Sequence, residues 1–180
     1  DAELLLLGDV TDQAQIPGGV VSLLTNFYQI AEKKFARIYT LGGNHCQKLI
    51  NDTVQHTTQF LDDRPNHTLI FKESIFVTDN GFEIVALPYQ RCVTDDYYSN
   101  ELPPEFYEEH DILVGHVAIK EPKTFYGGID ISKFHCKRFA FGHIHSRQGL
   151  HAEKYTGSIM PFRVDEQDEL AKLTRCMKVF

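Results

Sequence analysis

The sequence lacks three features that would each assign it to a broad class of proteins. It has no Cys-x-x-C pair, and its four cysteines lie far apart, which argues against a disulfide framework or a zinc knuckle and favours a reducing compartment. No run approaches the roughly 18 apolar residues of a membrane span. The formal net charge is -7, whereas a generic nucleic-acid-binding domain carries a basic excess. We therefore expect a soluble, cytoplasmic protein (nuclear in a eukaryotic cell) that holds any polyanionic substrate locally.

The sequence does contain enough apolar material for one ordinary domain. Its 180 residues are 42% hydrophobic and 12% aromatic, which suits a single buried core. No internal repeat, low-complexity segment or linker marks a boundary. We therefore expect one domain over residues 1–180.

Apolar runs and turn residues predict a layered α/β domain. The run "ELLLLGD" predicts a strand buried on both faces, and "ARIYTLGGN" predicts a second strand. Between them, apolar residues at helical spacing follow the breaker Pro17-Gly18-Gly19 and predict a helix. These helical positions are Val20, Leu23, Leu24, Phe27 and Ile30. The first third of the chain thus reads as a β-α-β unit.

The remaining segments extend this pattern. Residues 47–61 predict a helix whose apolar side carries Leu49, Ile50, Val54 and Phe60. "TLIFKESIFVT" and "FEIVALPY" predict two strands joined by the turn Asp79-Asn80-Gly81. Residues 91–101 lack periodicity and predict a surface segment, followed by a short helix near residues 104–109. "DILVGH" and "RFAFGHIH" predict two further strands.

Four apolar runs end in the same way, in a glycine followed by a polar side chain. The four ends are Gly8-Asp9, Gly43-Asn44-His45, Gly115-His116 and Gly142-His143-x-His145. In layered α/β sheets, sites form beyond the carboxyl ends of strands, where glycine lets the backbone approach an ion or phosphate closely. Carboxylate, amide and imidazole groups together suit Mn²⁺, Fe²⁺ or Zn²⁺. We therefore expect these residues to converge on a metal site, with the alternating His143 and His145 facing two neighbouring ions.

The motifs "GDVTD", "GGNHC", "GHV" and "GHIH" resemble, in order, those of the calcineurin-like metallophosphoesterases. The strings "EIVALPY", "ILVGHVAI", "KRFAFGHIHSRQ" and "YTGSIMPFRVDEQ" narrow the resemblance to the DNA-nuclease branch, the Mre11/SbcD family, over essentially the whole chain. The resemblance implies a four-layer β-sandwich flanked by helices, with a two-metal site between the sheets. It also implies a metal-dependent DNA exo- or endonuclease of DNA repair and recombination, with a Rad50/SbcC-like ATPase partner and a homodimer as further expectations.

The metal ligands of that family carry over to matching positions of this sequence. Asp9 would bridge two divalent ions, for which Mn²⁺ is the first expectation and Mg²⁺, Fe²⁺ or Zn²⁺ the alternatives. Asn44, His116 and His143 would complete the site of the second ion, and His145 would bind the first. Two ions about 4 Å apart can activate a water molecule and neutralise charge on phosphoryl oxygens.

Other residues would act on the substrate. His45, beside the amide ligand, would be catalytic and would stabilise or protonate the leaving oxygen. Arg147 would hold a phosphate of the substrate. The remaining histidines fit no ligand pattern and are expected at the surface; they are His56, His67, His110, His135 and His151.

The sequence departs from the family pattern in three places. No Asp-x-His motif occurs, so we expect either a missing preceding strand or a single-metal or degenerate site. Cys46 stands where the family usually has an aspartate that orients the histidine, and a thiol does this weakly. We expect Cys46 to be a buried thiol without a metal role. The chain ends soon after "YTGSIMPF", so we expect the capping domain to be absent or very small.

Two other functions stay open at this point. The first is a small-molecule phosphatase or cyclic-nucleotide phosphodiesterase of the same superfamily, which would act on small phosphate esters and not on DNA. The second is a non-catalytic scaffold that retains a degenerate metal site, which the missing Asp-x-His motif would explain.

Overall fold

The protein is a mixed α/β structure with two principal sheets. The computed structural model describes residues 1–51, 53–91, 93–121, 127–145 and 151–156. The strands in these ranges are β1 (Glu3–Leu6), β2 (Arg37–Leu41), β3 (Gln47–Ile50), β4 (Thr53–His56), β5 (His67–Ile70), β6 (Ser74–Val77), β7 (Glu83–Leu87), β8 (Glu109–Gly115) and β9 (His135–Phe141). The α-helices are α1 (Gly18–Ala31) and α2 (Asp95–Asn100). The 3₁₀ turns are η1 (Thr57–Leu61), η2 (Pro104–Tyr107), η3 (Ile131–Lys133) and η4 (Ala152–Lys154).

The first sheet is parallel, with the strand order β1-β2-β5. The central strand β2 is buried from Ile38 to Leu41, whereas all four residues of β1 are only half-buried. The predicted strand at "ELLLL" is therefore confirmed, but its burial on both faces is wrong. Among the described strands β1 pairs with β2 alone, so it lies at the edge of the sheet and is covered less completely.

The second sheet has the strand order β6-β7-β8-β9. β7, β8 and β9 are parallel, while β6 pairs antiparallel with β7 across the turn that contains Gly81, whose φ is +84°. The predicted Asp79-Asn80-Gly81 turn is confirmed. The single strand predicted for "TLIFKESIFVT" is wrong, because the run divides into β5 and β6, which belong to different sheets. The chain passes between the sheets near Glu73, whose carboxylate accepts hydrogen bonds from the Gln90 amide and the Tyr97 hydroxyl.

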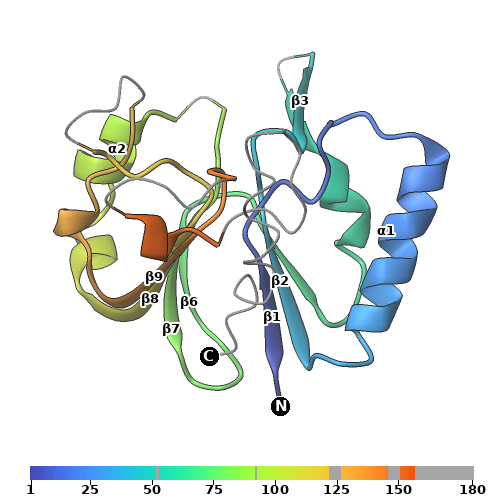
Figure 1. Ribbon diagram of the computed structural model, residues 1–180, viewed down its shortest axis with the longest axis horizontal. Coiled ribbons are helices and arrows are strands. Elements are labelled where there is room, and N and C mark those ends of the chain that lie inside the picture. Colours follow the sequence, from blue (N-terminus) through green and yellow to red (C-terminus); the bar gives the residue numbers. More distant parts are fainter. Residues whose placement is uncertain (52, 92, 122–126, 146–150, 157–180) are drawn as a thin grey trace.

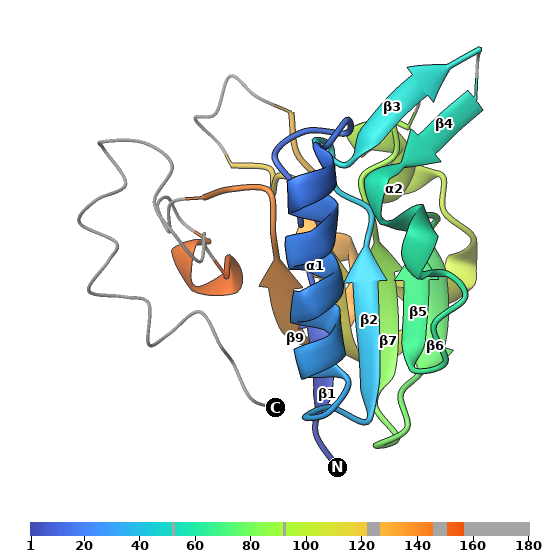
Figure 2. The ribbon, with the colours of Figure 1, turned by 90° about the vertical axis from the view of Figure 1, so that its right-hand side faces the viewer.

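The two sheets share a core and are covered by helical segments on their outer sides (Figure 1). Tyr39 and Leu41 of the first sheet pack against Ile84, Ala86 and Val114 of the second. In the view of Figure 2, α1 lies in front of β1 and β2, with the second sheet behind them. The side of the second sheet away from this shared core packs against α2, η2 and η3 through a larger apolar cluster. The order through the molecule is helix, sheet, sheet, helical segments.

Helix α1 confirms the predicted helix and carries apolar side chains on two faces. Leu24, Tyr28 and Ala31 pack toward the first sheet. Leu23 and Ile30 point outward and are 69% and 57% exposed, with Phe27 also exposed between them. No charged residue occurs between Gly18 and Ala31. A surface helix normally carries polar side chains opposite its buried stripe, so the outer face of α1 is unusually apolar.

The helix predicted over residues 47–61 is wrong. Strands β3 and β4 pair antiparallel as a hairpin, with Gln47 opposite His56, and among the described residues of this range only η1 is helical. The hairpin turns at Asn51, whose φ is +49°, a left-handed conformation that asparagine tolerates better than most residues and that interrupts a helix. The prediction placed Leu49 and Ile50 on the apolar side of this helix, but both residues lie on β3 and are exposed.

The segment predicted to run over the surface, residues 91–101, contains helix α2. Thr94 is its N-cap: the Thr94 hydroxyl accepts a hydrogen bond from the Tyr97 amide, and Asp95 and Asp96 occupy the first turn. This Thr-Asp-Asp signal was present in the sequence, but the helix is too short to show apolar periodicity. The short helix predicted near residues 104–109 is confirmed as η2. Within the described residues, neither α1 nor α2 has the length and apolar character that a membrane span requires.

Candidate metal centre

The four glycine-polar strand ends meet where the two sheets face each other. His116, directly after β8, is 1% exposed, and its Nδ1 donates a hydrogen bond to the Leu7 carbonyl oxygen after β1 at 2.6 Å. Because a carbonyl oxygen can only accept, Nδ1 carries the proton. The other ring nitrogen, Nε2, is thereby directed at side chains from the first sheet.

Asp9, Asn44 and His116 form the centre of the site. His116 Nε2 lies 3.0 Å from Asp9 Oδ2 and 2.9 Å from Asn44 Oδ1. If His116 is neutral with its proton on Nδ1, the lone pair of Nε2 faces the lone pairs of Asp9 Oδ2 and Asn44 Oδ1, and these atoms repel one another. An imidazolium or a bound cation relieves this repulsion, so the arrangement suits positive charge at this point.

His143 joins the group from the end of β9. Its Nδ1 lies 3.1 Å from Asn44 Oδ1, and its ring meets the ring of His116 edge-on with centroids 5.2 Å apart. Asp9 and His143 both have positive φ, at +45° and +71°. Such conformations are uncommon outside glycine and cluster at functional sites.

The charges of Asp9 and His143 are set by their surroundings. Burial works to raise the pKa of Asp9, but the hydrogen bond and charge of His116 and the backbone amide of His45 hold it below the ordinary value. Burial, reinforced by His116, lowers the pKa of His143 to about 4. Near neutral pH the pair is therefore a carboxylate and a neutral imidazole, the forms that bind metal ions.

Glycine permits the close approach of these chain segments. A methyl group on Gly43 would lie 2.2 Å from both the backbone nitrogen and Oδ1 of Asp9. At Gly8, whose φ is +86°, it would lie 2.2 Å from His116 Nδ1. Side-chain carbons essentially never approach other atoms below 3.0 Å. The glycines of the predicted motifs therefore have a steric role in bringing Asp9 and His116 together.

His45 lies at the open side of this group. Its backbone amide donates to Asp9 Oδ1 at 2.8 Å, and its side chain is 45% exposed. The adjacent Cys46 is buried, and its thiol contacts Thr11 rather than a ligand of the site. Burial raises the pKa of this thiol, which keeps it protonated. The expectation of a buried thiol is confirmed.

The other two predicted site residues are His145 and Arg147. His145 is half-buried, and its charge contributes to lowering the pKa of His143. Arg147 lies outside the described residues. Within the described part of the chain, no three His, Cys, Asp or Glu side chains surround one common point. The amide of Asn44 is the shared neighbour of His116 and His143.

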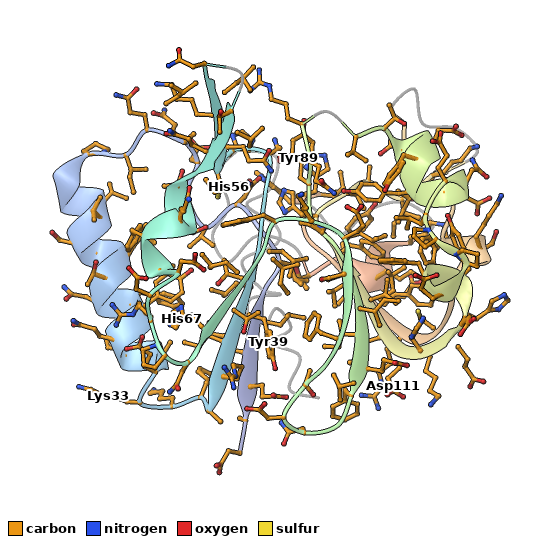
Figure 3. All side chains as sticks on the ribbon, turned by 180° about the vertical axis from the view of Figure 1, so that it is seen from behind. Lys33, Tyr39, His56, His67, Tyr89 and Asp111 are labelled. Atoms are coloured by element: carbon orange, nitrogen blue, oxygen red, sulfur yellow. The ribbon has the colours of Figure 1, made fainter. Side chains whose placement is uncertain are left out.

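Three histidines expected at the surface are at least partly buried. His67 has a side chain 0% exposed beside Glu32, and His110 bonds to Glu83 and the Glu105 carbonyl. His56 stacks on Phe71 with centroids 3.7 Å apart. Figure 3 shows His67 near α1 and His56 near the β3–β4 hairpin, both away from Asp111 and the lower end of the second sheet. The surface prediction failed because each ring has a partner distant in sequence. His135 is exposed as predicted and His151 is half-buried.

Two partners of the site were missed from the sequence. The Leu7 carbonyl, which fixes His116, has no side-chain signal. Asp12 lies beside His45, and it could have been found in the sequence as the second aspartate of "GDVTD".

No protein-family model matches the chain, and no curated protein matches it.

Proposed function

We propose that this chain is a metal-dependent phosphodiesterase of the calcineurin-like kind, and specifically a DNA exo- or endonuclease resembling the Mre11/SbcD family. The observation that carries the proposal is the convergence of Asp9, Asn44, His116 and His143 from four separate strand ends. The order helix, sheet, sheet, helical segments supports the four-layer sandwich that this resemblance implies.

The donor set fits a divalent ion. An ion with bonds of about 2.1 Å at near right angles holds neighbouring ligand atoms about 3 Å apart. The contacts of His116 with Asp9 and Asn44, and of His143 with Asn44, measure 2.9 to 3.1 Å. These four residues would hold one ion, and Asp9 with His145 would contribute to a second, with Mn²⁺ as the first expectation. Bound divalent ions supply an activated water molecule and positive charge for phosphoryl oxygens.

The chain's own residues would divide the remaining work. Asp9 is fixed by the His45 amide and by His116, so its two oxygens point in set directions. His45 stands at the solvent side, where a phosphodiester can enter. Its ring would stabilise or protonate the leaving oxygen of the substrate.

Partners form part of the same proposal. DNA is the substrate, and a Rad50/SbcC-like ATPase is the partner that the resemblance implies. The exposed Leu23, Phe27 and Ile30 on the uncharged helix α1 favour a homodimer, since exposed apolar patches mark protein contacts. Sedimentation of the wild-type chain and of Leu23→Lys tests the homodimer. A wild-type dimer that is lost in Leu23→Lys supports the proposal, whereas a wild-type chain that sediments as a monomer contradicts it.

Metal titration followed by hydrolysis assays tests the function. We expect calorimetry to show Mn²⁺ binding that His143→Ala weakens at least about tenfold, because one donor is lost. We expect the wild-type chain with Mn²⁺ to hydrolyse linear DNA. Hydrolysis of p-nitrophenyl phosphate without any cleavage of DNA would favour the phosphatase. Binding of Mn²⁺ without hydrolysis of either substrate would favour the scaffold.

A further inference from the structure

The loop that carries Asn44 and His45 is held at both ends by one residue of the second half, Tyr89. Residues 42–46 form this loop and join β2 to β3, whereas Tyr89 follows the end of β7. At the start of the loop, the Gly42 carbonyl oxygen accepts a hydrogen bond from the Tyr89 amide at 2.9 Å. Directly after the loop, the Gln47 side-chain amide donates to the Tyr89 carbonyl oxygen at 2.5 Å. Two contacts with the same residue therefore bracket the loop.

The stretch of chain from the end of β7 to Tyr89 also contacts the other side of the site. The His116 amide donates to the Leu87 carbonyl oxygen at 3.0 Å, while His116 Nε2 lies 2.9 Å from Asn44 Oδ1. In Figure 3, Tyr89 lies near His56, at the end of the molecule from which the β3–β4 hairpin projects. Site residues keep their geometry when supporting hydrogen bonds fix the segments that carry them. Residues 87–89 thus supply one frame for both Asn44 and His116.

The Gln47 side chain provides this contact from inside the protein. Gln47 is 6% exposed, whereas the other three residues of β3 are exposed. Because a carbonyl oxygen can only accept, the contact with Tyr89 directs Gln47 Nε2 toward Tyr89 and Oε1 away from it. Within the described residues, Gln47 Oε1 and Nδ1 of His56, its neighbour across the hairpin, are buried atoms without a hydrogen-bond partner. An unpaired buried polar atom costs free energy, so the glutamine is not optimal for stability at this position.

We propose that Gln47 is a positioning residue of the candidate metal centre: its amide ties the loop that carries Asn44 to the connection after β7, and so holds Asn44 against His116. The effect on catalysis rests on the proposed function, in which the same loop carries His45. The tie between the two halves rests on the hydrogen bond to Tyr89 alone.

The first experiment compares Gln47→Met with the matched control Gln55→Met. Methionine is about as long as glutamine but cannot donate a hydrogen bond, and Gln55 is an exposed glutamine on β4 of the same hairpin. We expect calorimetry to show Mn²⁺ binding about tenfold weaker in Gln47→Met, because a support of Asn44 is lost. On linear DNA with Mn²⁺, we expect kcat to fall about tenfold and KM to change less than about twofold. We expect Gln55→Met to match the wild type, and equal Mn²⁺ affinity in Gln47→Met and the wild type would overturn the proposal.

Thermal unfolding separates positioning from a general structural role. We expect Gln47→Met to unfold within about 2 °C of the wild type, because removal of the unpaired Oε1 offsets the lost hydrogen bond. A fall of more than about 5 °C would show that Gln47 supports the whole fold, and would overturn the specific role at the site.

Amide hydrogen exchange in the metal-free chain tests the tie without any activity. We expect the backbone amides of His45 and Tyr89 to exchange at least about tenfold faster in Gln47→Met than in the wild type. The amide of Val114, buried on β8, should exchange at the same rate in both proteins. Unchanged exchange at His45 and Tyr89 would overturn the proposal. If the wild-type chain cleaves neither DNA nor small esters, the proposed function fails, and hydrogen exchange still decides the role of Gln47.

Discussion

The half of the molecule built on β6 to β9 buries its apolar surface more completely than the half built on β1, β2 and β5. Among the described residues, the cluster around the outer side of the second sheet contains twelve buried residues, against four between α1 and the first sheet. The second half supplies the buried His116, and the first half supplies Asp9, Asn44 and His45 from connections. The site therefore joins a firmly packed frame to segments whose positions depend on specific polar contacts.

The largest effect on the free energy of unfolding should come from a substitution that leaves a cavity in the core of the second half. Leu113 on β8 is fully buried, so Leu113→Ala should cost about 2–5 kcal/mol of the free energy of unfolding. Leu23→Ala on α1 should change it by less than about 0.5 kcal/mol, because Leu23 is 69% exposed. Urea denaturation of both variants measures the contrast. Both variants are measured at a protein concentration where the chain is monomeric, and equal losses there would break the comparison.

A smaller effect on stability, but a specific one on the site, is expected for Gly43→Ala. The added methyl group would collide with Asp9, so the two connections of the first half, after β1 and after β2, can no longer lie at their observed distance. We expect a loss of about 1–3 kcal/mol in stability and at least about tenfold weaker Mn²⁺ binding. Gly19→Ala is the matched control, since a methyl group there meets nothing within 4 Å. Unchanged Mn²⁺ affinity in Gly43→Ala would show that the close approach to Asp9 is unnecessary.

The smallest effect concerns the polar contact between Glu32, at the end of α1, and Arg64, before β5. The Arg64 guanidinium donates two hydrogen bonds to the carboxylate and holds the pKa of Glu32 below its ordinary value of 4.5. A lowered carboxyl pKa stabilises the fold above the ordinary value, and this stabilisation disappears as the pH falls through the folded-state pKa.

Arg64→Ala should therefore cost about 1 kcal/mol at neutral pH, and the difference from the wild type should shrink below about pH 4.5. Unfolding by urea at a series of pH values tests the sign, with Arg91→Ala as a control for loss of an exposed arginine. A difference that stays constant with pH would show that Arg64 contributes by packing alone.

Local patterns predicted much of the fold. Strands β1, β2, β7, β8 and β9 and helix α1 follow from apolar runs and from breakers such as Pro17-Gly18-Gly19, because each pattern reflects the preferences of the residues themselves. The β3–β4 hairpin and the division of "TLIFKESIFVT" between two sheets were not predicted. Leu49 and Ile50 fit a helix side as well as a strand, and only contacts far along the chain distinguish these states.

The sequence by itself determined that Asp9, Asn44, His116 and His143 follow strand ends, because glycine and a polar residue after an apolar run specify a turn wherever the strand lies. Only the tertiary structure decided the partners of these residues. His116 is fixed by the Leu7 carbonyl, and His45 lies against Asp12 while Cys46 turns to Thr11. Such pairings depend on packing between segments remote in sequence, and neither composition nor periodicity encodes which of several nearby polar groups a side chain will meet.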